Sequence, residues 1–85
     1  MARIQVYADA DFNGDDSTFD RTIPDIGTFL NDKITSARVY EGRWELWEHP
    51  DFHGRMVVLE PGEYPNIAIY PGGLSNDTIS SVRIV

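Results

Sequence analysis

The 85-residue sequence contains no cysteine and no long run of apolar side chains. The absence of cysteine excludes disulfide bonds and thiolate zinc sites, so this small chain must find its stability elsewhere. No stretch approaches the roughly 18 apolar residues of a membrane-spanning helix, and the N-terminal residues lack the apolar core of a secretory signal. We therefore expect no membrane partner. Two locations stay open: the cytoplasm, or the outside of the cell for a module excised from a secreted protein.

Positive charge is also scarce. Seven residues are lysine or arginine, against 14 aspartate and glutamate residues, which gives a formal net charge of −7. Nucleic acids and anionic membrane surfaces require a positive protein face, so this balance argues against both as partners. It suits divalent cations or a basic partner, although an acidic surface also serves solubility alone.

Little of the chain can form helix. Five prolines, seven glycines and 12% aromatic residues are spread along it, and short segments of alternating polarity are separated by Gly, Asn and Asp. This pattern predicts an all-β sandwich or barrel in one domain, residues 1–85. The apolar members of the alternating segments include Ile4, Val6, Phe12, Trp44, Leu46, Phe52, Val58, Val82 and Ile84.

The sequence repeats itself internally. A shift of 40 residues places IQVYADADFNG (4–14) over WELWEHPDFHG (44–54). A shift of 45 residues places NDKITSARVY (31–40) over NDTISSVRIV (76–85). The difference falls in the loop-rich stretch 61–75, where an insertion costs little free energy.

Two copies of one β unit are therefore expected, 1–41 and 42–85, with four strands in each and eight in total. The first repeated element is an aromatic residue, four residues, a second aromatic, one residue and a glycine, from Tyr7 to Gly14 and from Trp47 to Gly54. The two aromatics can stack over a tight hairpin, and the glycine supplies a positive φ. We interpret this element as structural.

The second repeated element is Asn-Asp-x-Ile-[Thr/Ser]-Ser, at Asn31–Ser36 and Asn76–Ser81. Alternation directs Ile34 and Ile79 into the core and leaves a carboxylate and a hydroxyl at the strand entrance. Carboxylates, hydroxyls and loop carbonyls form an oxygen-only environment, which calcium prefers. The alternative is a pair of Asx turns that hold no ion. The residues concerned are Asp32, Thr35, Asp77 and Ser80, with Asn31 and Asn76 supporting the turns.

Together, the paired hairpins and the paired NDKITS and NDTISS loops resemble a microbial-type βγ-crystallin domain, over essentially the whole chain. The resemblance implies two intertwined Greek keys that form an eight-stranded β-sandwich with two calcium sites. It also implies the ligands. Asp32 and Asp77 would bind through carboxylates, Lys33 and Thr78 through main-chain oxygens, Thr35 and Ser80 through hydroxyls shared between the halves, and Ala8 and Glu48 through main-chain carbonyls.

The sequence departs from the family pattern at two of these positions. Ala8 stands where an acidic residue is usual, which a carbonyl ligand tolerates but which removes nearby charge. Thr35 stands where serine is usual, and its methyl group can crowd the site.

Residues 9–20 (DADFNGDDSTFD) imitate the calcium loop of an EF-hand. Asp16 replaces the usual core aliphatic residue, Asp20 replaces the bidentate glutamate, and Pro24 interrupts an exiting helix. We therefore reject the EF-hand and interpret Asp9–Asp16 as a solvated acidic loop.

No catalytic motif stands out. His49 and His53 are four residues apart in a hairpin with no third ligand of matching type, so we expect a solvated turn rather than a zinc site. The chain has neither a Gly-x-Ser-x-Gly elbow nor a glycine-rich phosphate loop, and we expect no enzyme.

The sequence thus predicts a monomeric calcium-binding βγ-crystallin domain, in which two calcium ions stabilise the fold. The alternative is a structural or recognition module on the same fold with vestigial ion sites, which would bind a protein or sugar or inhibit an enzyme. Its candidate contact residues are the exposed aromatics among Tyr40, Trp44, Tyr64 and Tyr70, and the sequence alone does not say which of them are exposed.

Overall fold

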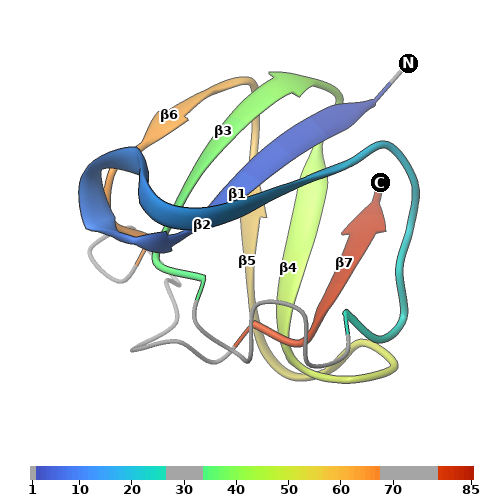
Figure 1. Cartoon of the computed structure of the whole chain (residues 1–85). Helices are drawn as coiled ribbons and strands as arrows, with labels where there is room; N and C mark the ends of the chain where they lie inside the picture. Colours follow the sequence, from blue (N-terminus) through green and yellow to red (C-terminus); the bar gives the residue numbers. More distant parts are fainter. Residues whose placement is uncertain (1, 27–33, 68–78) are drawn as a thin grey trace.

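The computed structural model describes residues 2–26, 34–67 and 79–85, and these ranges contain seven β-strands and one short 3₁₀ turn (Figure 1). Within them, no helix has the length and apolar character needed to cross a membrane. The elements are β1 (Arg3–Asp9), η1 (Ala10–Phe12), β2 (Asn13–Phe19), β3 (Ser36–Glu41), β4 (Trp44–His49), β5 (His53–Leu59), β6 (Gly62–Tyr64) and β7 (Ser81–Ile84).

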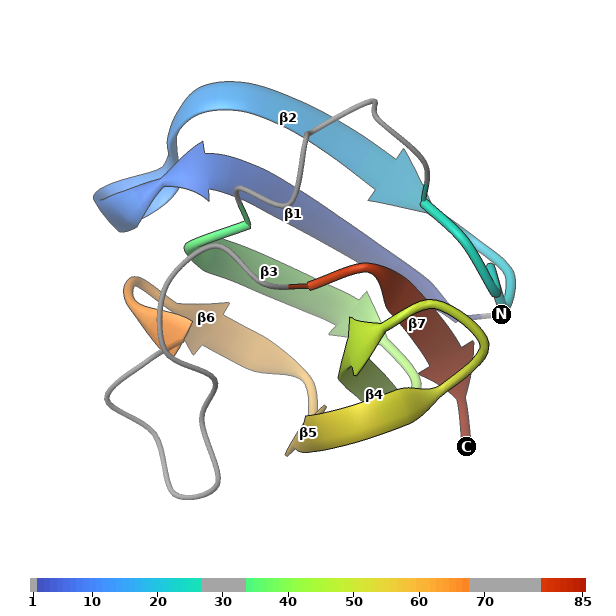
Figure 2. The ribbon, with the colours of Figure 1, turned by 90° about the horizontal axis from the view of Figure 1, so that it is seen from below.

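The strands form two antiparallel sheets that face each other (Figure 2). One sheet has the order β2-β1-β3-β6, and the other has the order β5-β4-β7. Strand β6 belongs to the second half of the chain, yet it pairs with β3 of the first half. The two halves are therefore interleaved, as the resemblance implies.

The prediction of eight strands is met only in part. Beside β7, Ile23 makes an isolated bridge to Val82 through backbone hydrogen bonds of 2.8 and 3.0 Å, and no eighth strand forms within the described ranges. Past Ile23 the regular register is lost, because the amide of Ile26 donates to the carbonyl of Ser80 (2.8 Å), a bond that a regular antiparallel ladder would take from residue 25. Because Ile23 comes from the first half, its bridge mirrors the exchange of β6.

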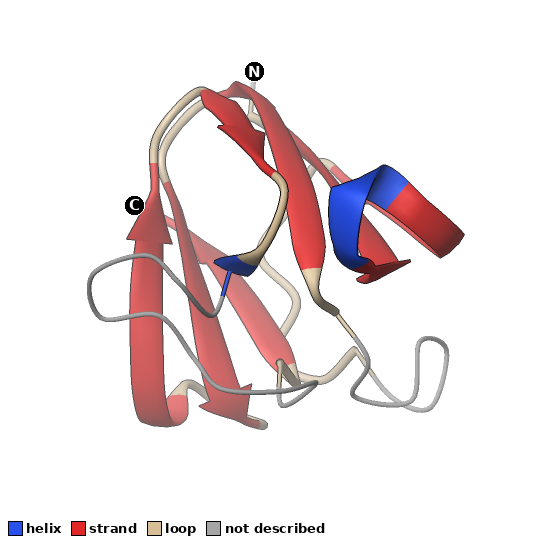
Figure 3. Cartoon of the chain, turned by 90° about the vertical axis from the view of Figure 1, so that its left-hand side faces the viewer, coloured by secondary structure: helices blue, strands red, loops and turns tan. Residues whose placement is uncertain are grey.

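Figure 3 shows the two layers of strands from the side. The buried apolar side chains of both layers form one hydrophobic cluster. The alternation predicted for β1 and β4 is confirmed, because Ile4, Val6, Trp44 and Leu46 are fully buried. Each such side chain stabilises the fold by about 1.5–3 kcal/mol relative to an exposed one. The other buried members are Ile34, Ala37, Val39, Val57, Leu59, Ile67, Ile79 and Val82.

One residue of the predicted apolar pattern lies elsewhere. Val58 is 43% exposed, whereas Val57 is buried. Because successive residues of a strand point to opposite faces, the inward position of Val57 directs Val58 to solvent.

Candidate metal centre

Each predicted calcium loop lies partly outside the described residues. The part that is described begins at Ile34 in the first half and at Ile79 in the second, and both side chains are buried in the core as predicted. The predicted site residues outside the described ranges are Asn31, Asp32, Lys33, Asn76, Asp77 and Thr78.

The two hydroxyl residues of the motifs occupy equivalent positions. The backbone amide of Thr35 donates to the carbonyl of Tyr7 (2.9 Å), and the amide of Ser80 donates to the carbonyl of Trp47 (2.9 Å). Both hydroxyl residues are half-buried. These bonds bring each hydroxyl residue next to the predicted carbonyl ligand of its own half, which is Ala8 or Glu48.

Residues of the opposite half contact the same two positions. The amide of Ile67 donates to the carbonyl of Thr35 (2.8 Å), and the amide of Ile26 donates to the carbonyl of Ser80 (2.8 Å). Ile26 directly precedes segment 27–33, and Ile67 directly precedes segment 68–78. The described residue that precedes each Asn-Asp pair is therefore bonded to the hydroxyl residue of the other half.

A β-bulge lies opposite each predicted carbonyl ligand. In the β1–β2 pair the register runs from Tyr7–Asp16 to Asp9–Asn13, so β2 has one extra residue opposite Ala8. The β4–β5 pair has the same irregularity opposite Glu48. Bulges interrupt the ladder locally and often occur next to functional sites.

Gly14 and Gly54 form these bulges with φ values of +80° and +85°, which confirms the predicted positive φ. An added methyl group at Gly54 would lie 2.5 Å from Cδ2 of His49. The exposed His49 side chain can move away, so the folded hairpins need glycine chiefly for its conformation.

The residues two and three positions before each glycine are also in the left-handed region. Asp11, Phe12, Asp51 and Phe52 have φ values of 58°, 61°, 60° and 60°. Such conformations cost about 1–3 kcal/mol each and persist only where surrounding contacts hold them.

Two buried serines supply those contacts. The hydroxyl of Ser36 accepts from the amide of Phe12 (3.0 Å) and donates to the carbonyl of Asp9 (2.6 Å). In the second half, the hydroxyl of Ser81 accepts from the amide of Phe52 (3.2 Å) and donates to the carbonyl of His49 (2.7 Å). Both serines are fully buried.

Sequence reasoning gave these serines no role, although a signal was present. Ser36 lies two residues after Ile34, and Ser81 lies two residues after Ile79, so alternation directs both hydroxyls inward. A buried hydroxyl requires hydrogen-bond partners. Its recurrence in both copies predicts a repeated polar contact.

An arginine covers the aromatic pair of each hairpin. The Tyr7 and Phe12 rings make the predicted edge-to-face contact, with centroids 5.6 Å apart. The guanidinium of Arg38 lies 4.1 Å from the Phe12 centroid, and that of Arg83 lies 5.1 Å from the Phe52 centroid. Burial raises the pKa of the Tyr7 phenol, and the neighbouring Arg38 opposes the shift.

The sequence is similar to those of known proteins over almost its whole length. The family model described as Beta/Gamma crystallin matches residues 3–85. This chain belongs to the beta/gamma crystallin family. Gamma-crystallin S of Macropus fuliginosus is 35% identical over 85 residues, which is 100% of this chain and 46% of that protein. The chain spans about half the length of the curated relatives it matches.

Solved structures of the family agree with the fold. A βγ-crystallin from an archaeon has a TM-score of 0.89 and 34% identity, covering 99% of this chain and 98% of the other. A transition-metal-ion-binding βγ-crystallin from Methanosaeta thermophila has a TM-score of 0.77 and 26% identity, covering 95% of this chain and 98% of the other. The predicted resemblance to a microbial βγ-crystallin is therefore confirmed.

The side chain of Glu48 is engaged within its own hairpin. Its Oε1 atom lies 3.5 Å from Nε2 of His49 and accepts a 3.4 Å hydrogen bond from the amide of Arg55. Within the described ranges of this βγ-crystallin chain, no three His, Asp or Glu side chains gather to hold a metal.

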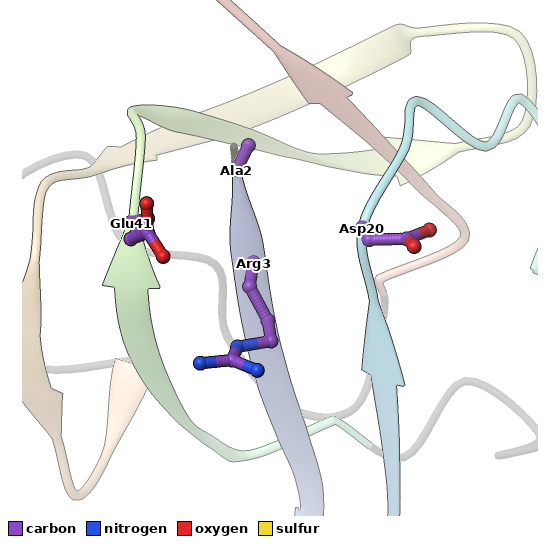
Figure 4. A pocket seen from close by; sticks show the side chains of 4 residues that line it. All are labelled: Ala2, Arg3, Asp20 and Glu41. Carbon is purple, nitrogen blue, oxygen red and sulfur yellow. The ribbon is translucent and has the colours of Figure 1, made fainter.

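A small cavity of about 180 Å³ lies at the other end of β1 (Figure 4). Arg3 of β1 lies between Glu41 of β3 and Asp20, which follows β2, and Ala2 completes the lining. Cavities that enclose small organic ligands usually have about 300–1,000 Å³. This cavity is therefore too small for a typical ligand of that kind.

The two histidines and the candidate aromatic residues differ in how exposed they are. His49 and His53 are exposed and lie opposite each other across β4 and β5, as residues of a solvated turn. Of the aromatic candidates, Tyr40 is exposed, Tyr64 is half-buried, and Tyr70 lies outside the described residues. Trp44 is fully buried and is therefore not one of the exposed candidates.

Proposed function

We propose that this βγ-crystallin chain binds two calcium ions, one beside Thr35 and one beside Ser80, and that binding stabilises the fold. The observation that supports the proposal most directly is the pair of bonds between the halves, Ile67 to Thr35 and Ile26 to Ser80. They connect the start of each Asn-Asp segment to the hydroxyl residue of the opposite half. An ion at either position would therefore draw ligands from both halves of the chain.

The proposed ligands are all oxygens. Each site takes a main-chain carbonyl from Ala8 or Glu48, the neighbouring hydroxyl of Thr35 or Ser80, and one Asn-Asp segment. That segment supplies the Asp32 carboxylate with the Lys33 carbonyl, or the Asp77 carboxylate with the Thr78 carbonyl. Such a set fits calcium, which accepts six to eight oxygens in flexible geometry.

The charge of the ligands sets the expected strength of binding. With about one carboxylate in each site, we expect dissociation constants on the order of 10⁻⁵ to 10⁻³ M. Binding to the folded form alone adds about 2.7 kcal/mol per site at a hundredfold excess of calcium over the dissociation constant. Two divalent cations would also offset more than half of the net charge of −7.

Isothermal titration of the chelator-treated chain with calcium tests the proposal. We expect two ions per chain and a melting temperature that rises with calcium; magnesium, which is smaller and prefers octahedral geometry, should bind more weakly. The absence of heat, together with the same melting temperature in chelator and in millimolar calcium, would refute calcium binding. It would favour the alternative of a recognition module, for which Tyr40 is the exposed aromatic residue.

A further inference from the structure

We propose that Ser36 and Ser81 are positioning residues for calcium, each setting the affinity of one ion by fixing the main-chain carbonyl that its hairpin offers. The inference rests on the proposed calcium function, because it concerns how strongly those sites bind. It goes beyond that function by assigning a role to two side chains that would not touch the ion.

Hydrogen bonds hold the chain on both sides of the proposed carbonyl ligand. On either side of Ala8, the Tyr7 carbonyl accepts from the amide of Thr35 (2.9 Å), and the Asp9 carbonyl accepts from the hydroxyl of Ser36 (2.6 Å). Both neighbours of Ala8 are thus bonded to consecutive residues at the start of β3. With both neighbours held, the direction of the Ala8 carbonyl relative to Thr35 is fixed.

The same arrangement occurs in the second half. The Trp47 carbonyl accepts from the amide of Ser80 (2.9 Å), and the His49 carbonyl accepts from the hydroxyl of Ser81 (2.7 Å). Glu48 lies between these two bonded residues, as Ala8 does in the first half. The repetition of the geometry, despite different residues at positions 8 and 48, indicates that the serine rather than the ligand residue defines the arrangement.

Without the serine hydroxyl, this part of the hairpin would be held less firmly. The register is irregular opposite Ala8, so the β1–β2 ladder holds this part of β1 less firmly than a regular ladder would. The following residues Asp11 and Phe12 have φ values of 58° and 61°, and the Phe12 amide donates to Ser36. Loss of the hydroxyl would remove a bond from each side of this strained turn and let the hairpin relax.

The two serine side chains would not contact an ion themselves. Ser36 and Ser81 are fully buried, and each hydroxyl already has one donor and one acceptor on its own hairpin. They therefore act on an ion through the backbone. Partners that orient metal ligands in this indirect way typically change metal affinity by about 10- to 100-fold when they are removed.

Single and double alanine variants test the proposal by calcium titration with two resolved binding steps. We expect Ser36→Ala to weaken one step by about 10- to 100-fold and leave the other unchanged, and Ser81→Ala to weaken the other step. The double variant should weaken both. A matched control is Val57→Ala, which destabilises the core from β5; its two affinities, measured where it is folded, should equal those of the unaltered chain.

Hydrogen exchange in the unaltered chain provides a second measurement that does not depend on a folded variant. Calcium should slow exchange of the Phe12 and Phe52 amides, which donate to the two serines, by at least tenfold more than it slows exchange of amides in the middle of β3. Equal slowing at both places would overturn the proposal.

The outcomes separate this inference from the proposed function. If the unaltered chain binds two ions and both alanine variants bind them equally well, the positioning role is refuted while calcium binding stands. If either serine variant weakens both steps equally, the one-to-one assignment is refuted. If the unaltered chain binds no calcium, the proposed function fails and this inference fails with it.

Discussion

Arg83 on β7 lies directly across from Glu45 on β4, and its Nη2 atom is 2.7 Å from Oε1 of that glutamate. The same oxygen accepts a 3.2 Å hydrogen bond from Nε1 of Trp47. Only 10% of the Glu45 side chain is exposed. A carboxylate removed from water to this degree depends on its donors, so the removal of one donor is expected to cost more stability than the loss of an exposed ion pair.

Replacing Arg83 tests that expectation. Arg83→Ala should lower the free energy of unfolding by about 1–3 kcal/mol, less than for a fully buried pair because 44% of the Arg83 side chain is exposed. Urea unfolding gives the value. The control is Arg21→Ala, whose pair with Asp20 is largely exposed and should change stability by less than about 0.5 kcal/mol. Equal losses in the two variants would contradict the prediction.

Adjacent valines on β5 provide a test of the strand register. Val57→Ala removes buried methyl groups and should cost about 1.5–3 kcal/mol, whereas Val58→Ala should cost less than about 0.5 kcal/mol. Thermal or urea unfolding of both variants gives the comparison. A larger loss at Val58 would mean that β5 presents the opposite face to the core.

This valine pair also shows the limit of sequence periodicity. Alternation correctly placed Ile4, Val6 and Leu46 in the core, because polar residues separate these apolar positions. In β5 the run Met56, Val57, Val58, Leu59 is continuously apolar, so the sequence alone does not say which residues face inward. The cross-strand pairs Leu46–Val57 and Trp44–Leu59 settle the register.

The site was predictable for a different reason. Duplication marked both hydroxyl residues and both hairpin glycines, and the structure shows them at equivalent places. The contacts between the halves could not be predicted in this way, because Ile26 and Ile67 lie outside the matched segments. Ile26 reaches Ser80, and Ile67 reaches Thr35, only through the exchange of chain segments between the sheets. Within the described residues the eighth strand is reduced to one bridge at Ile23, because the pairing beside β7 loses its regular register after that residue, a local effect that a strand count by repeat ignores.

Glycine substitutions test the hairpin conformation. Gly14→Ala and Gly54→Ala should each cost about 1–2 kcal/mol, because φ values of +80° and +85° strain any other residue. The exposed His49 ring, 2.5 Å from the added methyl group at Gly54, can rotate away, so the backbone strain should dominate. Circular dichroism melts give the loss. Unchanged stability in both variants would mean that the hairpins tolerate alanine in this conformation.

Carboxylate removal tests the proposed division into two sites. Asp32→Asn and Asp77→Asn should each reduce the calcium stoichiometry from two to one under conditions that saturate the unaltered chain. Each should also reduce the rise in melting temperature, which we expect to be about 10–20 °C per site at a hundredfold excess of calcium. Asp20→Asn is the matched control, since Asp20 follows β2 near the start of β1, away from Thr35 and Ser80. A full two-ion titration of either loop variant would disprove its assigned carboxylate.

The Tyr7 phenol gives the fold a predictable alkaline limit. Its pKa is raised above the ordinary value of 10.0, chiefly by burial, so the folded state keeps the phenolic proton at a pH where the unfolded chain has lost it. Stability is therefore retained below about pH 10 and falls as the pH rises through the higher pKa of the folded state.

In Tyr7→Phe this loss of stability at high pH is absent, although the 3.4 Å bond from Arg38 is lost as well. The melting temperature of the variant should start lower at pH 8 and decline less steeply between pH 9.5 and 11.5. Val57→Ala is the control, because it lowers the melting temperature through the core and keeps the phenol, so its slope should equal that of the unaltered chain. Parallel pH profiles for the unaltered chain and Tyr7→Phe would show that another group sets the limit.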